Sequence, residues 1–368
     1  MVVAAGGTAG HVVPAMAVAD ELRASGAVVS FLGARGRIEA ELVPAAGYEI
    51  DLVKVRGIDR RNPLRAAQAG FEALGAVGAA RKVLRRRRAD AVVGGGGYVA
   101  GPAGLAAVMT RTPLILTEAD SHLGLANRLL AGRARRVCLA FPIAGREGER
   151  YLVTGRPVPQ AVLEGDRSAA RERFGIAPDG RCLLVFGGSQ GAKSINLAAV
   201  EAFAGGSGAV VPGMRGDVRP REFHVLHIAG KRDFPEVRRR LDAAPDRDRY
   251  TLLEYEPNLG DALAAADLVL ARSGGSIFEV AAAGKPAILV PYPFATADHQ
   301  TANAEWMRDG GAAMVIPDEE LNAERLWAEV AGVLDDPDRL EKMAASARGL
   351  ARPDAARRIA DEVLGAIG

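Results

Sequence analysis

Short apolar runs alternate with amphipathic segments along the whole chain. Residues 1–5 and 28–33 are apolar enough for buried strands, whereas residues 14–25 between them repeat apolar positions at helical spacing. Pro14 suits the first turn of that helix, and Gly26 suits its end. Strands that alternate with helices in this way are typical of parallel sheets covered by helices, so the pattern predicts an α/β fold.

The same order of elements begins again in the second half of the chain. Residues 181–204 read as a strand, a glycine-rich loop and a helix, as the N-terminal segment does. We therefore expect two doubly wound, Rossmann-like domains, 1–160 and 161–345, that face a central cleft, and a final amphipathic helix within 346–368. Ligands of such sheets bind beyond the carboxyl ends of the strands, so the loops there carry the candidate chemistry.

Composition narrows the possible functions. Hydrophobic residues make up 49% of the 368 and charged residues 25%, as in globular proteins, and a formal net charge of +2 gives no global field that attracts nucleic acid. No apolar run reaches the about 18 residues that span a bilayer, so any membrane contact is expected to be peripheral and cytosolic. Cys138 and Cys182 lie in apolar runs and are expected to be buried free thiols in a reducing cytosol.

The motif GGTAGH at residues 6–11 follows the first predicted strand. The spacing of Gly6, Gly7 and Gly10 differs from G-x-G-x-x-G, and no acid ends the second predicted strand, which disfavours a dinucleotide site. The bare backbone still permits a ligand to approach closely, and N–H groups at a helix start favour an anion. His11 is either a functional group at this rim or a surface histidine near a helix start.

Three loops of the second predicted domain place polar groups after strands. Residues 187–191 offer N–H groups and a hydroxyl that suit a phosphate, although a tight turn also needs such glycines. Residues 273–276 could hold a diphosphate, and Glu279 could accept two hydrogen bonds from a ribose diol, although a helix start favours an acid without any ligand. Residues 298–303 could read sugar hydroxyls or form a solvated loop with a helix cap.

Six motifs taken together resemble those of one enzyme family. In chain order they are GGTAGH, GGGGYVAGPAGLAA, GRPV, GGSQGAKSIN, RSGGSIFEVAAAGKPAILVPYP and DHQTANA. This ordered set, which spans almost the whole chain, is similar to that of the MurG glycosyltransferases of bacterial cell-wall synthesis. The resemblance implies the two-domain GT-B fold, with the last helix crossing back onto the N-terminal domain.

The resemblance further implies an inverting hexosyltransferase that converts lipid I into lipid II. Such an enzyme transfers N-acetylglucosamine (GlcNAc) from UDP-GlcNAc to the C4 hydroxyl of N-acetylmuramic acid in undecaprenyl-diphosphate-linked muramyl pentapeptide. The residue-level reading of the sequence leaves two alternatives open. One is the same fold with another reaction or acceptor, such as a UDP-GlcNAc 2-epimerase, and the other is a non-catalytic nucleotide-binding or oxidoreductase-like Rossmann protein.

Roles for single residues also follow from the resemblance. His11 would be the catalytic base or would orient the acceptor, with Glu118 and Asp120 as rival candidates for the base. Ser276 with its neighbours would bind the diphosphate and Glu279 the ribose. The full set of expected substrate-binding positions is Thr8, Ala9, Gly10, Asp120, Arg156, Ser189, Glu256, Leu259, Ser273, Gly274, Gly275, Ser276, Glu279, Gln300 and Asn303.

In that set, the uracil would be read by the backbone of Glu256 and by packing from Leu259, while Gln300 would bind GlcNAc hydroxyls. Two motifs depart from the family pattern. The usual HEQN reads TEAD here, so Asp120 replaces an asparagine. Arg156 replaces the asparagine of GNPV, and the arginine that usually follows that motif is a proline.

No cofactor or metal is expected, because helix N-termini and hydroxyls can stabilise the leaving diphosphate. The D-x-D triplets at 246–248 and 336–338 do not end strands and are interpreted as turns. Residues 58–88 mix apolar positions with Arg60, Arg61, Arg65 and four consecutive arginines, 85–88. Because the acceptor is lipid-linked, this segment is expected to dock on the cytoplasmic face of the membrane, unless it is a core helix with a solvated basic end. Cell-wall synthesis proteins are further possible partners.

Overall fold

The chain divides into two units, each described by itself. The computed structural model describes residues 1–55, 63–188, 191–205, 222–295 and 298–367, with the backbone alone for 63–71. Unit 1 consists of Met1–Pro159 with Arg352–Gly368, and unit 2 of Gln160–Ala351. The predicted boundary between 345 and 346 falls inside a helix of unit 2, whereas the expected cleft stays a prediction.

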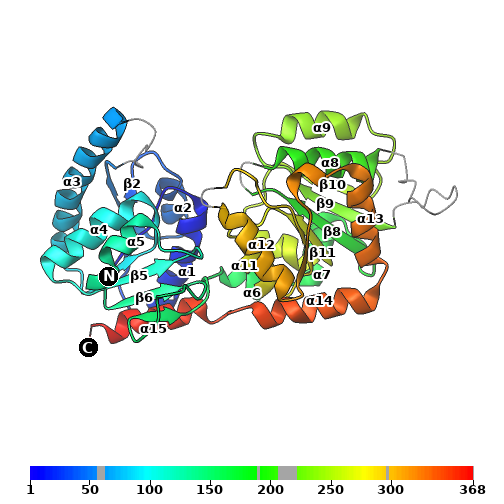
Figure 1. Ribbon diagram of the computed structural model, residues 1–368. Helices are drawn as coiled ribbons and strands as arrows, with labels where there is room; N and C mark the ends of the chain where they lie inside the picture. The colour runs from blue at the N-terminus through cyan, green and yellow to red at the C-terminus, as the bar shows by residue number, and fades with distance from the viewer. Residues whose placement is uncertain (56–62, 189–190, 206–221, 296–297, 368) are drawn as a thin grey trace. The chain divides into compact units, whose positions relative to one another are not determined.

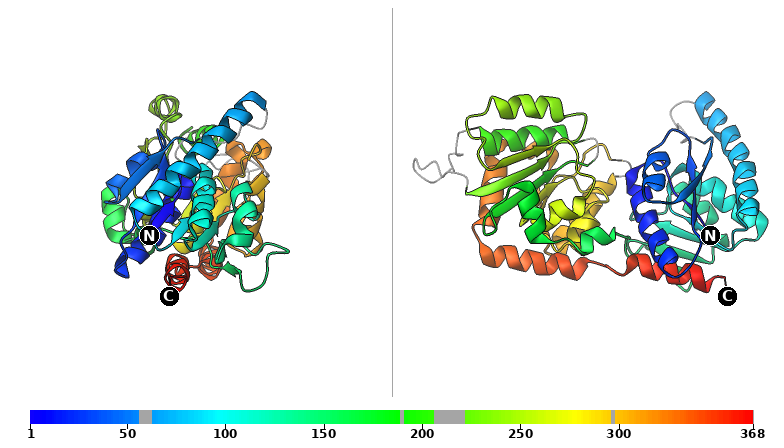
Figure 2. Two further views of the ribbon diagram at one scale, coloured as in Figure 1. Left: turned by 90° about the vertical axis from the view of Figure 1, so that its left-hand side faces the viewer. Right: turned by 180° about the vertical axis from the view of Figure 1, so that it is seen from behind.

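Unit 1 is built on a parallel sheet with helices on both faces (Figures 1 and 2). In the described residues, seven strands lie in the order β3-β2-β1-β4-β5-β6-β7. They are β1 Val2–Ala4, β2 Ser30–Ala34, β3 Glu49–Val53, β4 Val92–Gly94, β5 Leu114–Glu118, β6 Arg136–Leu139 and β7 Tyr151–Val153. The order reverses beside β1, so the loops after β1 and β4 meet at the carboxyl edge of the sheet, where ligands of such folds bind.

The helices of unit 1 include one from the C-terminus of the chain. They are α1 Ala9–Ala24, α2 Glu39–Ala45, α3 Pro63–Arg86, α4 Gly97–Thr110, α5 Leu125–Leu130, the 3₁₀ turn Ala131–Arg133 and α15 Ala355–Gly365. Helix α15 packs against α1, and its buried Ile359, Ala360 and Val363 join the core that contains β1. An ion pair of 2.5 Å between Arg136 Nε and Glu362 Oε2 fixes α15 to the strand β6.

Unit 2 repeats the plan with a six-stranded parallel sheet in the order β10-β9-β8-β11-β12-β13. Its strands are β8 Arg181–Phe186, β9 Phe223–Ile228, β10 Tyr250–Leu253, β11 Leu268–Ala271, β12 Ala287–Leu289 and β13 Ala313–Val315. Its helices are α6 Gln160–Leu163, α7 Arg167–Phe174, α8 Lys193–Ala204, α9 Phe234–Asp242, α10 Leu259–Ala265, α11 Ile277–Ala282, α12 His299–Asp309, η3 Asp318–Glu320, α13 Ala323–Leu334 and α14 Pro337–Leu350. The predicted pair of Rossmann-like parallel sheets is therefore confirmed.

The start of α1 differs from the sequence prediction. Helix α1 begins at Ala9, so Pro14 lies inside it and not in the first turn. Proline has no N–H, and the Gly10 carbonyl one turn earlier therefore receives no helical bond from residue 14. The guanidinium of Arg156 donates to that carbonyl instead, which ties the loop after β7 to the first turn of α1. The helix ends before Gly26 as predicted, and Gly26 adopts φ +84°.

Both cysteines are free and buried, as predicted. Burial raises the pKa of each thiol to about 12, so neither is a nucleophile near neutral pH. Of the helices in the described ranges, none is both long and apolar enough to cross a membrane.

Candidate active site

His11 sits in the first turn of α1, directly after the glycine loop that leaves β1. Thr8 precedes this helix in extended conformation, and its Oγ1 lies 3.0 Å from His11 Nδ1. The imidazole also packs on the backbone of Gly96, where an added Cβ would lie 2.5 Å from His11 Cδ2. Gly96 has φ +93°, so both conformation and space require glycine there. The GGTAGH and GGGGY motifs thus meet around one imidazole.

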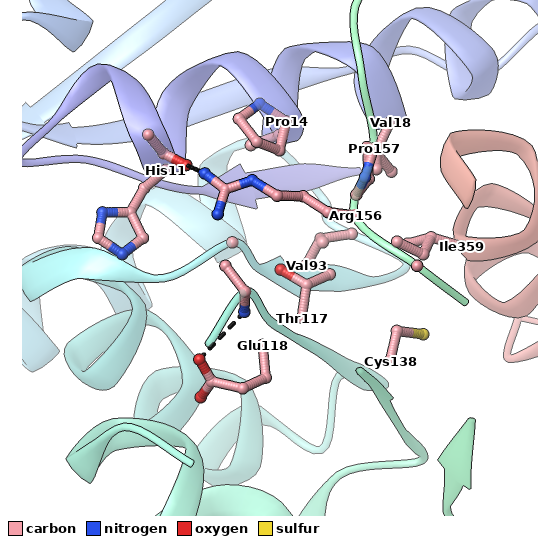
Figure 3. Close-up of a pocket in the computed structure, with 15 residues that line it drawn as sticks. His11, Pro14, Val18, Val93, Thr117, Glu118, Cys138, Arg156, Pro157 and Ile359 are labelled. Carbon is pink, nitrogen blue, oxygen red and sulfur yellow. Dashed lines mark hydrogen bonds between the residues drawn. The ribbon is translucent and has the colours of Figure 1, made fainter. Parts of the chain in front are cut away.

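The surroundings of His11 favour its neutral form. Burial lowers its pKa below the ordinary 6.5, and the nearby Arg156 guanidinium lowers it further, while Asp120 and Glu39 oppose the shift. Gly10, His11 and Arg156 line one hollow of unit 1 together with Glu118, Ala119 and Ile359 of α15 (Figure 3). A neutral, half-buried imidazole in a hollow can accept a proton from a bound hydroxyl.

Glu118 and Asp120, the rival bases, differ in their contacts. Glu118 is buried, and its carboxylate accepts hydrogen bonds from the N–H groups of Ala119, Asp120 and Gly124 and from Asn127 Nδ2, at 2.8–3.2 Å. Burial raises the pKa of Glu118 against the opposing effect of these bonds. The Asp120 side chain is half-buried and makes no hydrogen bond or ion pair within the described part of the chain. Within the described residues, the Asp120 carboxylate is therefore available to accept a proton, whereas the Glu118 carboxylate already accepts four hydrogen bonds.

Three residues at this site were not found by sequence reasoning. Asn127 binds the Thr117 carbonyl as well as Glu118, and so closes the loop after β5. Tyr98, 46% exposed, lies beside Gly7, whose added Cβ would be 3.4 Å from the ring. Glu39 is completely buried beneath the glycine loop. Tyr98 lies inside the GGGGYVAGPAGLAA motif and Asn127 follows TEAD by seven residues, so proximity to a motif could have pointed to these two. Glu39 gave no such signal, because its contact with Gly7 spans 32 residues of sequence.

In unit 2, the loop after β11 presents unused backbone donors. Among the described residues, no hydrogen bond uses the N–H groups of Gly274, Gly275 or Ser276, which precede α11. Glu279 lies in the first turn of α11 and is half-exposed. Three free N–H groups beside a carboxylate suit a diphosphate attached to a diol, the chemistry of a nucleoside diphosphate.

Other residues expected at this loop hold it in place. Ser273 is fully buried, and its hydroxyl donates to the Gln300 carbonyl at 2.7 Å. Asn303 is also buried and donates to the Ser273 carbonyl at 2.9 Å. The Gln300 Oε1 accepts from the Tyr292 N–H at 3.0 Å, while a Cβ on Gly274 would lie 3.9 Å from Gln300 Nε2. The loops after β11 and β12 are therefore one hydrogen-bonded assembly with α12.

The glycine loop after β8 rests on a buried polar network. Ser189 lies outside the described residues, but Gly188 and Gly191 have φ +86° and +82°. Asn196 Nδ2 donates to the Ala229 carbonyl and to Asp233 Oδ2, so its Oδ1 faces His227 Nε2 at 3.0 Å. His227 is fully buried, and burial lowers its pKa to about 3. Its Nε2 thus carries the proton that Asn196 accepts, a network the sequence did not reveal.

The residues expected to read uracil lie after β10. Glu256 is buried; its carboxylate accepts from Arg173 at 2.6 Å and from the Asn258 N–H at 2.8 Å. These bonds shape the turn that leads into α10, where half-buried Leu259 is the first residue. Of the D-x-D triplets, Asp336 caps α14 through the Arg339 N–H. In the described ranges, no group of three or more His, Cys, Asp or Glu side chains is arranged to hold a metal ion.

Comparison with known families gives the class of protein. Residues 1–139 match the glycosyltransferase family 28 N-terminal domain, and residues 182–359 match its C-terminal domain. The two matches fall on the two parallel sheets and include the glycine loops of both units. Fold and site together define a glycosyltransferase of family 28.

Curated relatives of similar length identify the family within this class of glycosyltransferases. Three from Moorella thermoacetica, Alkalilimnicola ehrlichii and Mycolicibacterium paratuberculosis are 38%, 42% and 41% identical, covering 98–99% of this chain and 98%, 97% and 88% of theirs. Each is a UDP-N-acetylglucosamine–N-acetylmuramyl-(pentapeptide) pyrophosphoryl-undecaprenol N-acetylglucosamine transferase. The crystal structure of MurG from Acinetobacter baumannii is 31% identical, with a TM-score of 0.75 and 99% of both chains covered. The chain belongs to the MurG family, as the sequence motifs predicted.

A UDP-GlcNAc 2-epimerase, one alternative left open by the sequence, resembles this chain in its fold alone. The UDP-GlcNAc 2-epimerase from Neisseria meningitidis, solved with UDP-GlcNAc, is 15% identical with a TM-score of 0.67, covering 99% of both chains.

Proposed function

We propose that this chain transfers GlcNAc from UDP-GlcNAc to the C4 hydroxyl of N-acetylmuramic acid in lipid I, forming lipid II for peptidoglycan synthesis. The observation that carries this proposal is full-length membership of the transferase family at 36–42% identity. The supporting geometry is a neutral imidazole in unit 1 and free backbone donors in unit 2.

In the proposed reaction, the C4 oxygen of the acceptor attacks C1 of GlcNAc as the bond from C1 to the diphosphate oxygen breaks. UDP leaves with the electron pair, and the C4 hydroxyl proton passes to His11 Nε2. For this, Nδ1 carries the other proton and donates to Thr8 Oγ1 3.0 Å away. The configuration at C1 inverts because one displacement occurs.

We further propose that no metal or other cofactor takes part. The N–H groups of Gly274, Gly275 and Ser276 are free to receive the diphosphate, with Ser189 of the second glycine loop as a further donor. Backbone dipoles fixed before the reaction stabilise a developing negative charge without reorganisation.

The decisive assay combines labelled UDP-GlcNAc with a lipid I analogue. We expect a disaccharide-lipid product and equimolar UDP, and no consumption of the donor when acceptor is omitted. An epimerase would instead convert the donor without acceptor, and that result would contradict the proposal.

Glu279→Ala is expected to weaken UDP binding by about 1.5–3 kcal/mol, because a carboxylate that accepts ribose hydroxyls is lost. Isothermal titration calorimetry with UDP measures this change. Glu305→Ala is the matched control, since Glu305 is an exposed acid of α12 in the same unit. Equal UDP affinity in the two variants would remove Glu279 from the ribose site.

We also propose that unit 1 docks peripherally on the cytoplasmic face of an anionic bilayer. Leu105 and Met109 of α4 and Leu129 of α5 are 41%, 53% and 66% exposed, and α4 packs against both α3 and α5. Arg60 and Arg61, expected to take part, lie outside the described residues, as does the side chain of Arg65.

Two arginines of the predicted run 85–88, together with Arg111, lie next to this apolar surface. Arg85, Arg88 and Arg111 line one hollow with Met109 at the ends of α3 and α4. None of the three guanidiniums pairs with an acid of the described ranges, whereas Arg86 and Arg87 bind Asp51. The exposed apolar side chains can enter the acyl region of a bilayer, while the adjacent arginines can bind its anionic headgroups.

Reversal of Arg85, Arg88 and Arg111 to Glu is expected to lower binding to anionic phospholipid vesicles by about 100-fold or more, since each basic residue contributes about 1 kcal/mol. The loss should be larger at low salt. Vesicle co-sedimentation measures it, with reversal of Arg238, Arg239 and Arg240 in α9 as a control of equal charge. Equal pelleting of both variants would contradict docking through this surface.

A further inference from the structure

Glu39 is a completely buried acid at the start of α2, and no motif pointed to it. Its Oε2 accepts from the Gly7 N–H and its Oε1 from the Ala34 N–H, both at 3.0 Å. Among the described residues, no cation pairs with it. A carboxylate buried without a cation is costly, and its two backbone donors offset that cost only in part.

The space around Glu39 is made by two glycines from different loops. A Cβ on Gly6 would lie 2.2 Å from Glu39 Oε1, and a Cβ on Gly33 would lie 2.8 Å from Glu39 Cγ. Any side chain at residue 6 would therefore displace the Glu39 carboxylate. This explains a glycine that the sequence assigned to ligand approach.

A short chain of hydrogen bonds and backbone connects Glu39 to His11. Glu39 fixes Gly7, the next residue Thr8 opens α1, and the Thr8 hydroxyl meets His11 Nδ1. We propose that Glu39 is a positioning residue for glycosyl transfer, which holds the glycine loop from beneath so that Thr8 and His11 keep their geometry. This inference rests on the proposed role of His11.

Electrostatics gives a second, separable consequence. Three charged groups act on His11: Arg156 after β7, Asp120 after β5 and Glu39 of α2. The Glu39 charge raises the pKa of His11, against burial and Arg156, which lower it. Removal of the Glu39 charge should therefore lower the pKa of His11 further. The acid limb of kcat/KM, where His11 takes up a proton, should then move to lower pH.

Glu39→Gln and Glu39→Asp separate position from charge. Glutamine carries no charge, and it replaces one of the two accepting oxygens with an NH2 group, so either the Gly7 or the Ala34 N–H would face a donor. Aspartate keeps the charge but is too short to reach both. We expect kcat to fall by about 10²-fold in both variants, as for a misplacement near 1 Å, whereas only Glu39→Gln should lower the pKa of His11. Glu41→Gln, an exposed acid in the same turn of α2, is the matched control and should change neither.

The pKa of His11 is measured by NMR titration without substrate, with the signal assigned from its loss in His11→Gln. A folded Glu39→Gln with wild-type kcat and an unmoved His11 titration would overturn the proposal. So would failure of both Glu39 variants to fold, since the carboxylate would then be structural only. If kcat falls and the NMR titration moves but the kcat/KM limb does not follow, Glu39 keeps its positioning role and the base assignment of His11 is wrong.

Discussion

His11→Ala is expected to lower kcat by about 10²–10⁴-fold, the usual contribution of general acid–base catalysis. The structure gives the physical reason. Burial and Arg156 lower the pKa of His11 below 6.5, so the imidazole is unprotonated near neutral pH and available as a base. The affinity for UDP should stay near wild type, because the loops that we propose to bind UDP lie in unit 2. Steady-state kinetics with a lipid I analogue and calorimetry with UDP measure the two effects.

The pH dependence follows from the same pKa. Protonation of His11 removes the base, so kcat/KM should fall as pH drops through a value below 6.5, and this limb should vanish in His11→Ala. His122→Ala is the control, since His122 is an exposed histidine of the loop after β5. Full kcat in His11→Ala would move the base to Asp120. A raised donor KM with unchanged kcat would instead make His11 a donor ligand.

The fold was predictable because its signals are local. Strands buried on both faces must be apolar throughout, which makes runs such as 182–186 and 268–271 visible without any partner. The beginning of α1 was not predictable in the same way. Pro14 marked a helix start by its own preference, whereas the Gly10 carbonyl that it leaves without a helical bond accepts from Arg156, 146 residues beyond Gly10. Tertiary contacts of this kind leave no local pattern.

The candidate site shows a similar limit. The glycine loops could be found from the sequence because glycine marks positions where the backbone adopts a positive φ. Gly96 with φ +93° and Gly191 with φ +82° are examples. Polar motif residues gave no sign of whether they face a ligand or the protein. The side chains of Ser273 and Glu256, two residues expected to contact substrate, are buried and bonded within unit 2, and the expected contact of Glu256 was through its backbone. Which of them also touches substrate through its backbone stays a prediction.

Asp267→Asn is expected to lower the free energy of unfolding of unit 2 by about 3–5 kcal/mol, the usual effect of removing one partner from a buried ion pair. Asp267 Oδ2 accepts from Arg171 and from the Cys182 N–H, both at 2.8 Å, and Oδ1 accepts from Arg167 at 2.6 Å. The side chains of Asp267 and Arg171 are only 8% and 3% exposed. Asparagine keeps the shape but leaves the Arg171 charge buried without its counter-charge.

The measurement can be confined to unit 2. The only two tryptophans of the sequence, Trp306 and Trp327, lie in α12 and α13, so tryptophan fluorescence during urea unfolding reports on this unit alone. Asp242→Asn is the control, because its pair with Arg238 is long, 4.0 Å, and exposed, and such pairs contribute about 0–1 kcal/mol. Arg171 also donates to the Ala265 carbonyl that ends α10, the helix that begins at Leu259. Loss of Asp267 should therefore also loosen the turn that is expected to read uracil. Equal unfolding midpoints for Asp267→Asn and Asp242→Asn would contradict the predicted loss of stability.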